Sequence, residues 1–540
     1  MAATAEPRTA EGWSELCRRL AADEERLRAG GGADGLARQH KLGRLFVRER
    51  LAALLDPGAP FLELGLWAGH GMYSEWGDFV GAGVVTGVGT VAGRRVMIVA
   101  NDATVKAGAF VPMTCKKILR AQRIAGDCGL PLLYLVDCSG VFLPLQDEVF
   151  PDEDDFGRIF RNNAVFSAAG LPQYAAILGN CIAGGAYLPV LCDKVLMTEG
   201  SGLYLAGPSL VKAAIGQEAT SEELGGAAMH AALSGTIDFQ EKDDRACLER
   251  LRQLVALLPP DPEAPTGLEP ERPAADLRRI VPADGRHEYD VRDAARCLVD
   301  RESWNEYKAG YGKSLVCAYA RLDGSPVGVV ANQRVRVKAG RGELQMPGVI
   351  YADAADKAAR FVLDCNQSRI PLLFLQDVSG FMVGKEAEQS GIIRSGAKLV
   401  NAVSNSTVPK LTVILGGSFG AGNYALCGKA FDPRFIFAWP QARYAVMGAA
   451  QASDVVYQIL ARRQSGRAAE ELKALRERVR AAYEEQTDIR YGAARGWVDA
   501  IVAPEDTRAV LIHALTTAQR PAAGVRYGAG ARFRTGVLQV

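Results

Sequence analysis

The segment PLLYLVDCSG (131–140) recurs as PLLFLQDVSG (371–380), and seven of the ten positions hold the same residue. Each copy is an apolar run that ends in a polar Ser-Gly turn, which is typical of a buried strand followed by a tight turn. Three further pairs of segments match in the same order: 91–102 with 322–333, 175–187 with 412–424, and 234–239 with 495–500. Such ordered similarity predicts two copies of one fold in a single chain.

Both copies alternate short apolar stretches with segments of helical character, which is the pattern of an α/β fold. The stretches RVMIVAN (95–101) and PLLYLVD (131–137) are almost continuously apolar. Strands of this kind are expected where helices cover both faces of a sheet. We therefore predict two tandem α/β domains whose functional groups lie in the turns that follow the strands.

A proline-rich stretch separates the two copies. Residues 259–282 hold seven of the chain's 25 prolines, and proline favours an extended linker because it removes a backbone donor and fixes φ. Before the first copy, GRLFVRERLAALLDPG (43–58) has apolar residues at helical spacing. We expect an N-terminal helical segment at 1–57, a first domain at 58–258, a linker at 259–284 and a second domain at 285–535.

Composition excludes several classes of protein. With 540 residues the chain is too long for one core, since a domain takes about 150 residues. Its net charge is +1, so the charge does not favour nucleic acid or an anionic membrane as a partner. The 11 cysteines include no C-x-x-C pair, which argues against a zinc ribbon or a disulfide framework and predicts reduced thiols and no metal.

Residues 162–192 hold no charged residue, and the stretch is long enough to span a bilayer. It contains Pro172, Pro189 and four glycines, which do not suit a lipid-exposed helix. We predict instead a buried strand, QYAAILGN (173–180), followed by a glycine-rich turn and a buried helix. The first residues lack the apolar core of a signal peptide and include early acids, which disfavours a transit peptide as well.

Glycine turns follow equivalent strands in the two copies. The first turn reads CIAGGAY (181–187) and the second reads SFGAGNY (418–424). A turn of Gly and Ala at a helix N-terminus leaves N–H groups unpaired and lets a substrate approach closely. Two such groups aimed at one oxygen form an oxyanion hole, worth about 3–4 kcal/mol per donor in the transition state. Close packing of helix on strand is the alternative explanation, but matched turns in both copies favour catalysis.

Several segments together resemble the carboxyltransferase (β) subunits of biotin-dependent acyl-CoA carboxylases. They include IVANDATVKAGAF (98–110), AGGAYLP (183–189), GPSLVKAAIGQEATSEELGGAAMH (207–230), LLFLQDVSGFMVG (372–384) and GGSFGAGNYALCGKAFDPRFIFAWPQARYAVMG (416–448). The resemblance runs from about residue 43 to 508 and is strongest to the methylcrotonyl-CoA and geranyl-CoA carboxylase branch. The propionyl-CoA branch typically reads DSGGARIQEG where this chain has DCSGVFLPLQDE (137–148).

The resemblance implies two tandem crotonase-like domains of the ClpP/crotonase superfamily. In the first, Gly184 and Gly185 would offer N–H groups to the thioester oxygen of an acyl-CoA as it becomes an enolate. In the second, Gly420, Ala421 and Gly422 would surround the ureido oxygen of carboxybiotin. Loss of CO2 from carboxybiotin leaves a base strong enough to take the substrate proton, so no side-chain base is required.

The resemblance also implies binding residues around these catalytic turns. The loop NDATVKAG (101–108) would lie against the adenine of coenzyme A. The implied binding residues are Ala103, Thr104, Lys106 and Gly108 on the CoA side and Phe419, Asn423 and Tyr424 on the biotin side. Lys106, Lys116, Lys117 and Arg120 are either contacts to CoA phosphates or solvated helix faces, and the sequence leaves both interpretations open.

Partners follow from what the chain lacks. It has no A-M-K-M biotin-attachment motif and no ATP-grasp-like glycine-rich segment, so we expect a partner α subunit with biotin carboxylase and biotin-carrier domains, which alone uses ATP. The resemblance further implies a homo-oligomeric β core, usually a hexamer, without nucleic acid or membrane. It places the protein in leucine catabolism, in the cytoplasm of a bacterium or the mitochondrial matrix of a eukaryote.

Three other features have simpler interpretations. Residues 147–155 hold six acids at irregular spacing, which favours a helix cap near Phe156 over a cation site. His230 is predicted to make a structural hydrogen bond. Cys181 lacks a basic neighbour and is predicted to be a packed thiol rather than a nucleophile.

Alternative functions remain open at this point. A propionyl- or acetyl-CoA carboxylase β subunit and a biotin-dependent decarboxylase of the glutaconyl-CoA type use the same fold. A crotonase hydratase or hydrolase would need paired glutamates or another general base, and neither glycine turn carries one. A scaffold without activity would not need the second turn. Segments 65–83 and 334–357 depart from the methylcrotonyl pattern, and both can affect the acyl pocket.

Overall fold

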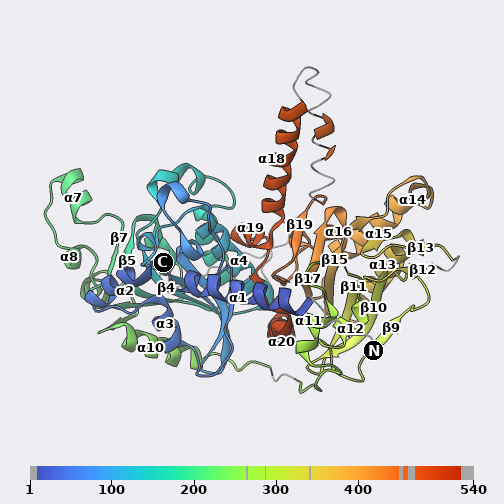
Figure 1. Ribbon diagram of the computed structural model, residues 1–540. Coiled ribbons are helices and arrows are strands. Elements are labelled where there is room, and N and C mark those ends of the chain that lie inside the picture. Colours follow the sequence, from blue (N-terminus) through green and yellow to red (C-terminus); the bar gives the residue numbers. More distant parts are fainter. Residues whose placement is uncertain are drawn as a thin grey trace. The chain divides into compact units, whose positions relative to one another are not determined.

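The computed structural model describes residues 9–262, 265–285, 287–339, 342–448, 454–455, 457–459 and 469–523. The chain forms two compact units. The N-unit comprises Ala22–Glu263, Ala494–Gly496 and Arg520–Val540, and the C-unit comprises Met1–Ala21, Ala264–Ala493 and Trp497–Gln519. Each unit contains one eight-stranded sheet covered by helices (Figure 1). The prediction of an α/β protein with a duplicated fold is confirmed, whereas the division at residues 58, 259 and 285 stays a prediction.

The N-unit sheet has the strand order β1-β2-β3-β4-β5-β6-β8, with β7 paired to β5. Its strands are β1 (Leu62–Leu64), β2 (Val84–Val91), β3 (Arg94–Asn101), β4 (Leu132–Cys138), β5 (Gln173–Ile182), β6 (Lys194–Thr198), β7 (Gly202–Tyr204) and β8 (Phe239–Glu241). β2 is antiparallel to β1 and β3, and the pairs from β3 onward are parallel.

The C-unit sheet has the order β20-β18-β17-β15-β11-β10-β9, with β19 paired to β17. Its strands are β9 (Asn305–Tyr307), β10 (Leu315–Leu322), β11 (Ser325–Asn332), β15 (Leu372–Val378), β17 (Lys410–Phe419), β18 (Phe435–Ala438), β19 (Arg443–Ala445) and β20 (Ala500–Ile501). β10 is antiparallel to its neighbours and the other pairs are parallel. The run β10-β11-β15-β17-β18 therefore repeats β2-β3-β4-β5-β6.

The antiparallel hairpin of each sheet closes with the same kind of turn. Both residues of Ala92-Gly93 and of Asp323-Gly324 have positive φ, which matches the right-handed twist of the flanking strands. The carboxylate of Asp56 accepts both N–H groups of the first turn at 2.8 and 2.7 Å. Asp300 accepts both of the second at the same distances. The repeat thus extends to the side chains that fix the register.

Helices cover each sheet with their apolar faces. In the N-unit, Leu51 of α3 (Val47–Leu54) and Leu248 of α10 (Asp244–Ala256) are buried in one cluster with Leu133 of β4. In the C-unit, α13 (Ala352–Gln367) and α15 (Ile392–Ser404) bury Phe361 and Leu399 in one cluster with β15.

The other helices include α1 (Thr9–Arg28), α2 (Gly32–Lys41), α4 (Pro112–Cys128), α5 (Phe156–Ala168), α6 (Tyr187–Val190), α7 (Pro208–Ile215), α8 (Ser221–Gly225), α12 (Val291–Ala295), α14 (Lys385–Gln389), α16 (Gly420–Ala425), α18 (Ala469–Thr487), α19 (Ile489–Ala494) and α20 (Thr507–Ala518). Within the proline-rich stretch lie the short helices η7 (Ala274–Asp276) and α11 (Leu277–Ile280), and Leu277 of α11 is fully buried. Of segment 334–357, β12 (Val337–Lys338) pairs with β13 (Leu344–Gln345), and residues 340–341 lie outside the described residues.

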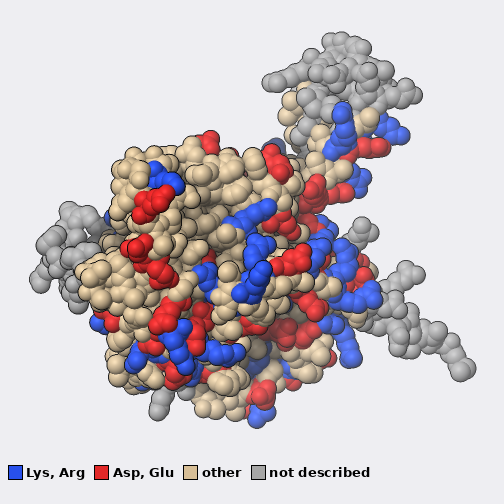
Figure 2. Space-filling view, turned by 90° about the vertical axis from the view of Figure 1, so that its left-hand side faces the viewer, with Lys and Arg blue, Asp and Glu red and all other residues tan. Residues whose placement is uncertain are grey.

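The uncharged stretch 162–192 folds as the end of α5, then β5, the turn η5 (Ala183–Ala186) and α6. The prediction of a buried strand at 173–180 is confirmed, since most of β5 is inaccessible to solvent. In the part of the chain that the structure describes, no helix is long and apolar enough to cross a membrane. On the face shown in Figure 2, basic and acidic side chains lie interspersed.

Candidate active site

The first glycine turn follows β5 directly. Ala183 has a φ of 57°, and Gly184 and Gly185 continue the turn into α6. A Cβ on Gly185 would lie 2.7 Å from Sγ of Cys138, and a Cβ on Gly184 would lie 2.8 Å from the ring of Phe156. Both glycines are therefore required by the close approach of the turn to the end of β4 and to α5.

The second glycine turn repeats this geometry. β17 ends at Phe419, Gly420 has a φ of 55°, and α16 begins at once. A Cβ on Gly422 would lie 2.5 Å from Cγ2 of Val378. Val378 occupies the place in its repeat that Cys138 occupies in the first. In both units, then, the last side chain of the preceding strand fills the space of the missing Cβ.

A bulge precedes each of these strand ends. The register of β4 on β5 shifts between Val136 and Cys138, and that of β15 on β17 shifts between Gln376 and Val378. Bulges are common beside active sites because they redirect a side chain. The residue inside each bulge is an aspartate, Asp137 or Asp377, whose carboxylate lies over a glycine of the next strand.

In the N-unit, Asp137 belongs to a buried ion cluster. Arg50 of α3 donates to Oδ2 of Asp137 at 3.1 Å, to Oδ2 of Asp244 at 2.8 Å and to the carbonyl of Leu178 at 2.8 Å. All three charged side chains are at most 5% exposed. Burial raises the pKa of Asp137, while Arg50 acts in the opposite direction. The cluster ties α3 and α10 to the end of β4, directly below the first glycine turn.

In the C-unit, Asp377 has a different set of partners. Its carboxylate accepts the N–H of Gly417 at 2.7 Å and the hydroxyl of Tyr289 at 3.0 Å, and Arg334 lies 3.0 Å away. The aspartate is therefore neutralised from the segment after β11 rather than from an N-terminal helix. Sequence reasoning missed both ion clusters; the available signal was a charged residue, Arg50, at helical spacing among the apolar residues of α3.

The predicted CoA loop also reaches the end of β4. A Cβ on Gly108 would lie 2.3 Å from the carbonyl of Asp137, and Lys106 and Ala107 have φ of 47° and 54°. Oγ1 of Thr104 accepts the N–H of Gly31 at 2.9 Å, from the α1–α2 turn, and donates to Asp102. The structure thus places the loop and the first glycine turn at the same strand end.

The basic residues around this loop differ in accessibility. Lys106 is exposed, and its Nζ lies 5.9 Å from the ring centroid of Phe79. Lys117 is buried and donates to the carbonyls of Gly81 and Val84 at 2.9 and 2.6 Å, and burial lowers its pKa to about 7. Of these two, only Lys106 has the exposure that a phosphate contact needs. The loop residue Ala103 is half-buried.

The residues around the second turn face in different directions. Asn423 is buried, and its amide donates to Oγ of Ser418 at 2.8 Å and to the hydroxyl of Tyr444 at 2.9 Å. Its side-chain donors are thus used within the protein. Tyr424 is half exposed, as is Tyr187 at the equivalent place in the first repeat. Ala421 is exposed and lies between the two glycines of α16.

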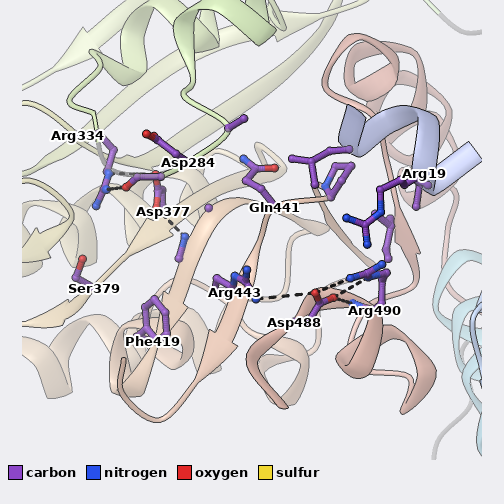
Figure 3. A pocket seen from close by; sticks show the side chains of 18 residues that line it. Arg19, Asp284, Arg334, Asp377, Ser379, Phe419, Gln441, Arg443, Asp488 and Arg490 are labelled. Carbon is purple, nitrogen blue, oxygen red and sulfur yellow. Dashed lines mark hydrogen bonds and ion pairs between the residues drawn. The ribbon is translucent and has the colours of Figure 1, made fainter. Parts of the chain in front are cut away.

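A pocket of about 550 Å³ opens in the C-unit beside Phe419. It lies beyond the carboxyl ends of β15, β17 and β18, and α1 and residues 283–285 also line it. Figure 3 shows its charged side chains, which are Arg19, Asp284, Arg334, Asp377, Arg443, Asp488 and Arg490. The carboxyl ends of parallel strands are where open α/β sheets bind ligands.

The remaining sequence predictions concern residues with structural roles. His230 is buried and its ring nitrogens bond to Ser234 and to the carbonyl of Leu203, both at 2.7 Å, as predicted. Cys181 is buried; contact with Cys138 and burial raise its pKa well above the usual value, which confirms a packed thiol. α5 begins at Phe156, after the acidic stretch, and the described residues contain no cluster of three or more metal-ligating side chains.

The match to a carboxyl transferase model and to carboxylase β subunits identifies this duplicated α/β unit, with a glycine turn after the same strand in both copies, as a carboxyltransferase built from two crotonase-like domains. The chain belongs to the carboxyl transferase family, whose domain model matches residues 38–526.

Known proteins are similar over almost the whole chain. The biotin-dependent 3-methylcrotonyl-coenzyme A carboxylase beta1 subunit of Mycobacterium tuberculosis is 46% identical over 525 residues, which cover 95% of this chain and 96% of the relative. The mitochondrial methylcrotonoyl-CoA carboxylase beta chain of Dictyostelium discoideum is 43% identical, covering 91% and 83%. The crystal structure of the geranyl-CoA carboxylase beta subunit of P. aeruginosa superposes with a TM-score of 0.87 at 36% identity and covers 99% of each chain. The family and branch suggested by the sequence motifs are confirmed.

Proposed function

We propose that the chain transfers a carboxyl group from carboxybiotin, carried by a partner α subunit, to a branched, unsaturated acyl-CoA of the methylcrotonyl-CoA type. The observation that carries this proposal is the pair of glycine turns, each seated against the end of an equivalent strand. One turn for each substrate explains why the fold is duplicated. The relatives named as methylcrotonyl-CoA carboxylase β subunits support this choice of acyl group.

On the CoA side, the N–H groups of Gly184 and Gly185 stabilise the thioester oxygen as it gains charge. Their positions are fixed by packing, so they need no reorganisation during the reaction. The loop with Ala103 and Thr104 binds the adenine, Gly108 seats that loop on β4, and Lys106 meets a phosphate.

On the biotin side, the backbone of Gly420, Ala421 and Gly422 surrounds the ureido oxygen. When bound, carboxybiotin supplies the carboxyl group and, once it is lost, the base that takes the substrate proton. The chain therefore needs to bind and orient both substrates and exclude water, and it needs no side-chain base. Phe419 and the half-exposed ring of Tyr424 border the turn, and Asn423 holds its first helical residues through Ser418.

The partners in the proposal follow from the same reaction. An α subunit charges biotin with ATP and bicarbonate, so ATP acts only there. The relatives that are named β subunits favour such an α–β assembly. We further propose a homo-oligomeric β core, a hexamer, and a role in leucine catabolism. The location is the cytoplasm in a bacterium or the mitochondrial matrix in a eukaryote, where the eukaryotic relatives are named as mitochondrial.

The acyl preference can be tested by carboxylation of methylcrotonyl-, geranyl-, propionyl- and acetyl-CoA with the reconstituted α–β enzyme. We expect methylcrotonyl-CoA to be used with a kcat/KM at least about 100-fold above that of acetyl-CoA, since an apolar pocket gains about 1–3 kcal/mol per methylene. Preference for propionyl- or acetyl-CoA would contradict the assigned acyl group. Absence of turnover from a stable α–β complex would contradict carboxyl transfer to any of the four.

The contact between Gly31 and the predicted CoA loop (101–108) offers a second test. A Cβ on Gly31 would lie 2.1 Å from the carbonyl of Thr104, although φ of Gly31 is an ordinary −74°. We expect Gly31→Ala to push the loop away and raise KM for the acyl-CoA about tenfold, the equivalent of 1.4 kcal/mol of binding, with little change in kcat. Gly310→Ala is the matched control, because its Cβ would meet nothing within 4 Å. An unchanged KM in Gly31→Ala would contradict the proposal that loop 101–108 forms part of the CoA site.

A further inference from the structure

The C-unit pocket carries charged groups that the proposed reaction does not use. Four arginines and three aspartates line it, so the lining has one net positive charge. They come from separate parts of the C-unit, namely α1, residues 283–285, the segment after β11, the end of β15, β19, and residues 488–490 at the start of α19. Such convergence of distant segments on one cavity is unlike a solvated charged face, where charges follow one element.

Two of the aspartates are fully engaged by protein. The carboxylate of Asp377 is held by Arg334, Tyr289 and the N–H of Gly417. Asp488 accepts Nε and a terminal nitrogen of Arg490 at 3.0 and 2.9 Å, which is a bidentate pair. These contacts neutralise two carboxylates with two guanidinium groups.

Cationic donors are left over after this pairing. Arg443 approaches Asp488 no closer than 3.9 Å and is 52% exposed, because Arg490 already occupies that carboxylate. The side chain of Arg19 extends from α1 into the pocket (Figure 3). Among the described residues it has no hydrogen-bond or ion-pair partner. Oδ2 of the third aspartate, Asp284, lies 3.1 Å from Nδ1 of the exposed His287.

The equivalent place in the N-unit is closed. There Arg50 fills the space at the strand-end aspartate and is 1% exposed, and its donors are satisfied by Asp137, Asp244 and Leu178. The fold is therefore stable when a buried arginine fills this place, as in the N-unit. The open pocket lined by arginines in the C-unit is not needed to hold the fold together.

We propose that the C-unit pocket binds an organic anion, with a carboxylate or phosphate group held by Arg443 and Arg19 and an apolar body against Leu16, Leu20 and Phe419. Guanidinium groups bind such oxyanions through paired hydrogen bonds. The volume of about 550 Å³ is that of a small-molecule site. This site borders the second glycine turn through Phe419, but its arginines take no part in the proposed carboxyl transfer, so the proposal goes beyond that function.

The test is calorimetric titration of the full chain, without α subunit, biotin or acyl-CoA, with 1-naphthyl phosphate, 1-naphthoate and the neutral 1-naphthylmethanol. We expect saturable binding of one anion per chain and no saturable binding of the alcohol. Comparison of the two anions distinguishes a phosphate from a carboxylate ligand. Because a charge-assisted contact is lost, Arg443→Gln and Arg19→Gln are each expected to weaken binding about tenfold.

The control is Arg301→Gln, which removes an exposed arginine of the same unit that does not line the pocket. It is expected to leave binding unchanged, and circular dichroism verifies that every variant is folded. Three outcomes would overturn the proposal: no saturable binding of either anion, equal binding of the neutral alcohol, or equal weakening by Arg301→Gln. Since no step of carboxyl transfer enters the measurement, its failure would leave the proposed function intact.

Discussion

Replacing Gly422 by alanine is expected to lower kcat for carboxyl transfer by about 100-fold or more, the loss seen when one oxyanion donor is misplaced. The added Cβ would lie 2.5 Å from Cγ2 of Val378, so α16 must shift away from β15. φ of Gly422 is not in the left-handed region, so the effect arises from contact and not from backbone strain. The measurement is turnover by the reconstituted enzyme, with acyl-CoA affinity determined separately.

The variant Val378→Ala distinguishes the two explanations of this glycine turn, which are a role in catalysis and close packing alone. It removes the methyl groups that the new Cβ would meet, so the double variant Gly422→Ala/Val378→Ala is expected to regain most of the lost kcat. The affinity for acyl-CoA is expected to stay within a factor of about two in all three variants, since the CoA site belongs to the other repeat. Wild-type kcat in Gly422→Ala would show that the glycine serves only packing. It would contradict the proposal that this turn forms part of the biotin site.

The elements that the sequence predicted well are those with a local signal. The segments 131–140 and 371–380 become β4 and β15 with their turns, because continuous apolar runs between turn residues allow few alternatives. The glycine turns were predicted for the same reason, and the repeat supplied the second observation that one turn alone lacks. What the structure adds is the steric cause, namely that Cys138 and Val378 fill the space of the missing Cβ atoms.

The features that escaped prediction join residues far apart in the chain. Arg50 lies 87 positions from Asp137 and 194 from Asp244, and no local pattern pairs them. The arginine-lined pocket draws on both ends of the C-unit's sequence for the same reason. Asn423 illustrates a different limit, since its position in the turn suggested a binding role while its side chain is turned inward to Ser418 and Tyr444.

Arg50→Met is expected to destabilise the N-unit by about 3–5 kcal/mol, the usual cost of removing one partner from a buried ion cluster. The substitution keeps most of the side-chain volume but leaves the carboxylates of Asp137 and Asp244 buried without their cation, and Leu178 without its donor. The free energy of unfolding would be measured in urea at pH 7. Arg26→Met is the control, because its pair with Asp23 is exposed and worth less than about 1 kcal/mol.

The pH dependence of Arg50→Met distinguishes lost charge compensation from lost packing. Burial already raises the pKa of Asp137 in the native chain, and loss of Arg50 removes the main opposing influence. The folded variant therefore binds a proton more tightly than the unfolded chain does, so its stability falls as pH rises above the unfolded pKa of about 4. The difference in the free energy of unfolding between wild type and Arg50→Met is thus expected to be smaller at pH 5 than at pH 7. A difference that is the same at both values would show that packing alone, and not the charge of Arg50, supports the strand end beneath the first glycine turn.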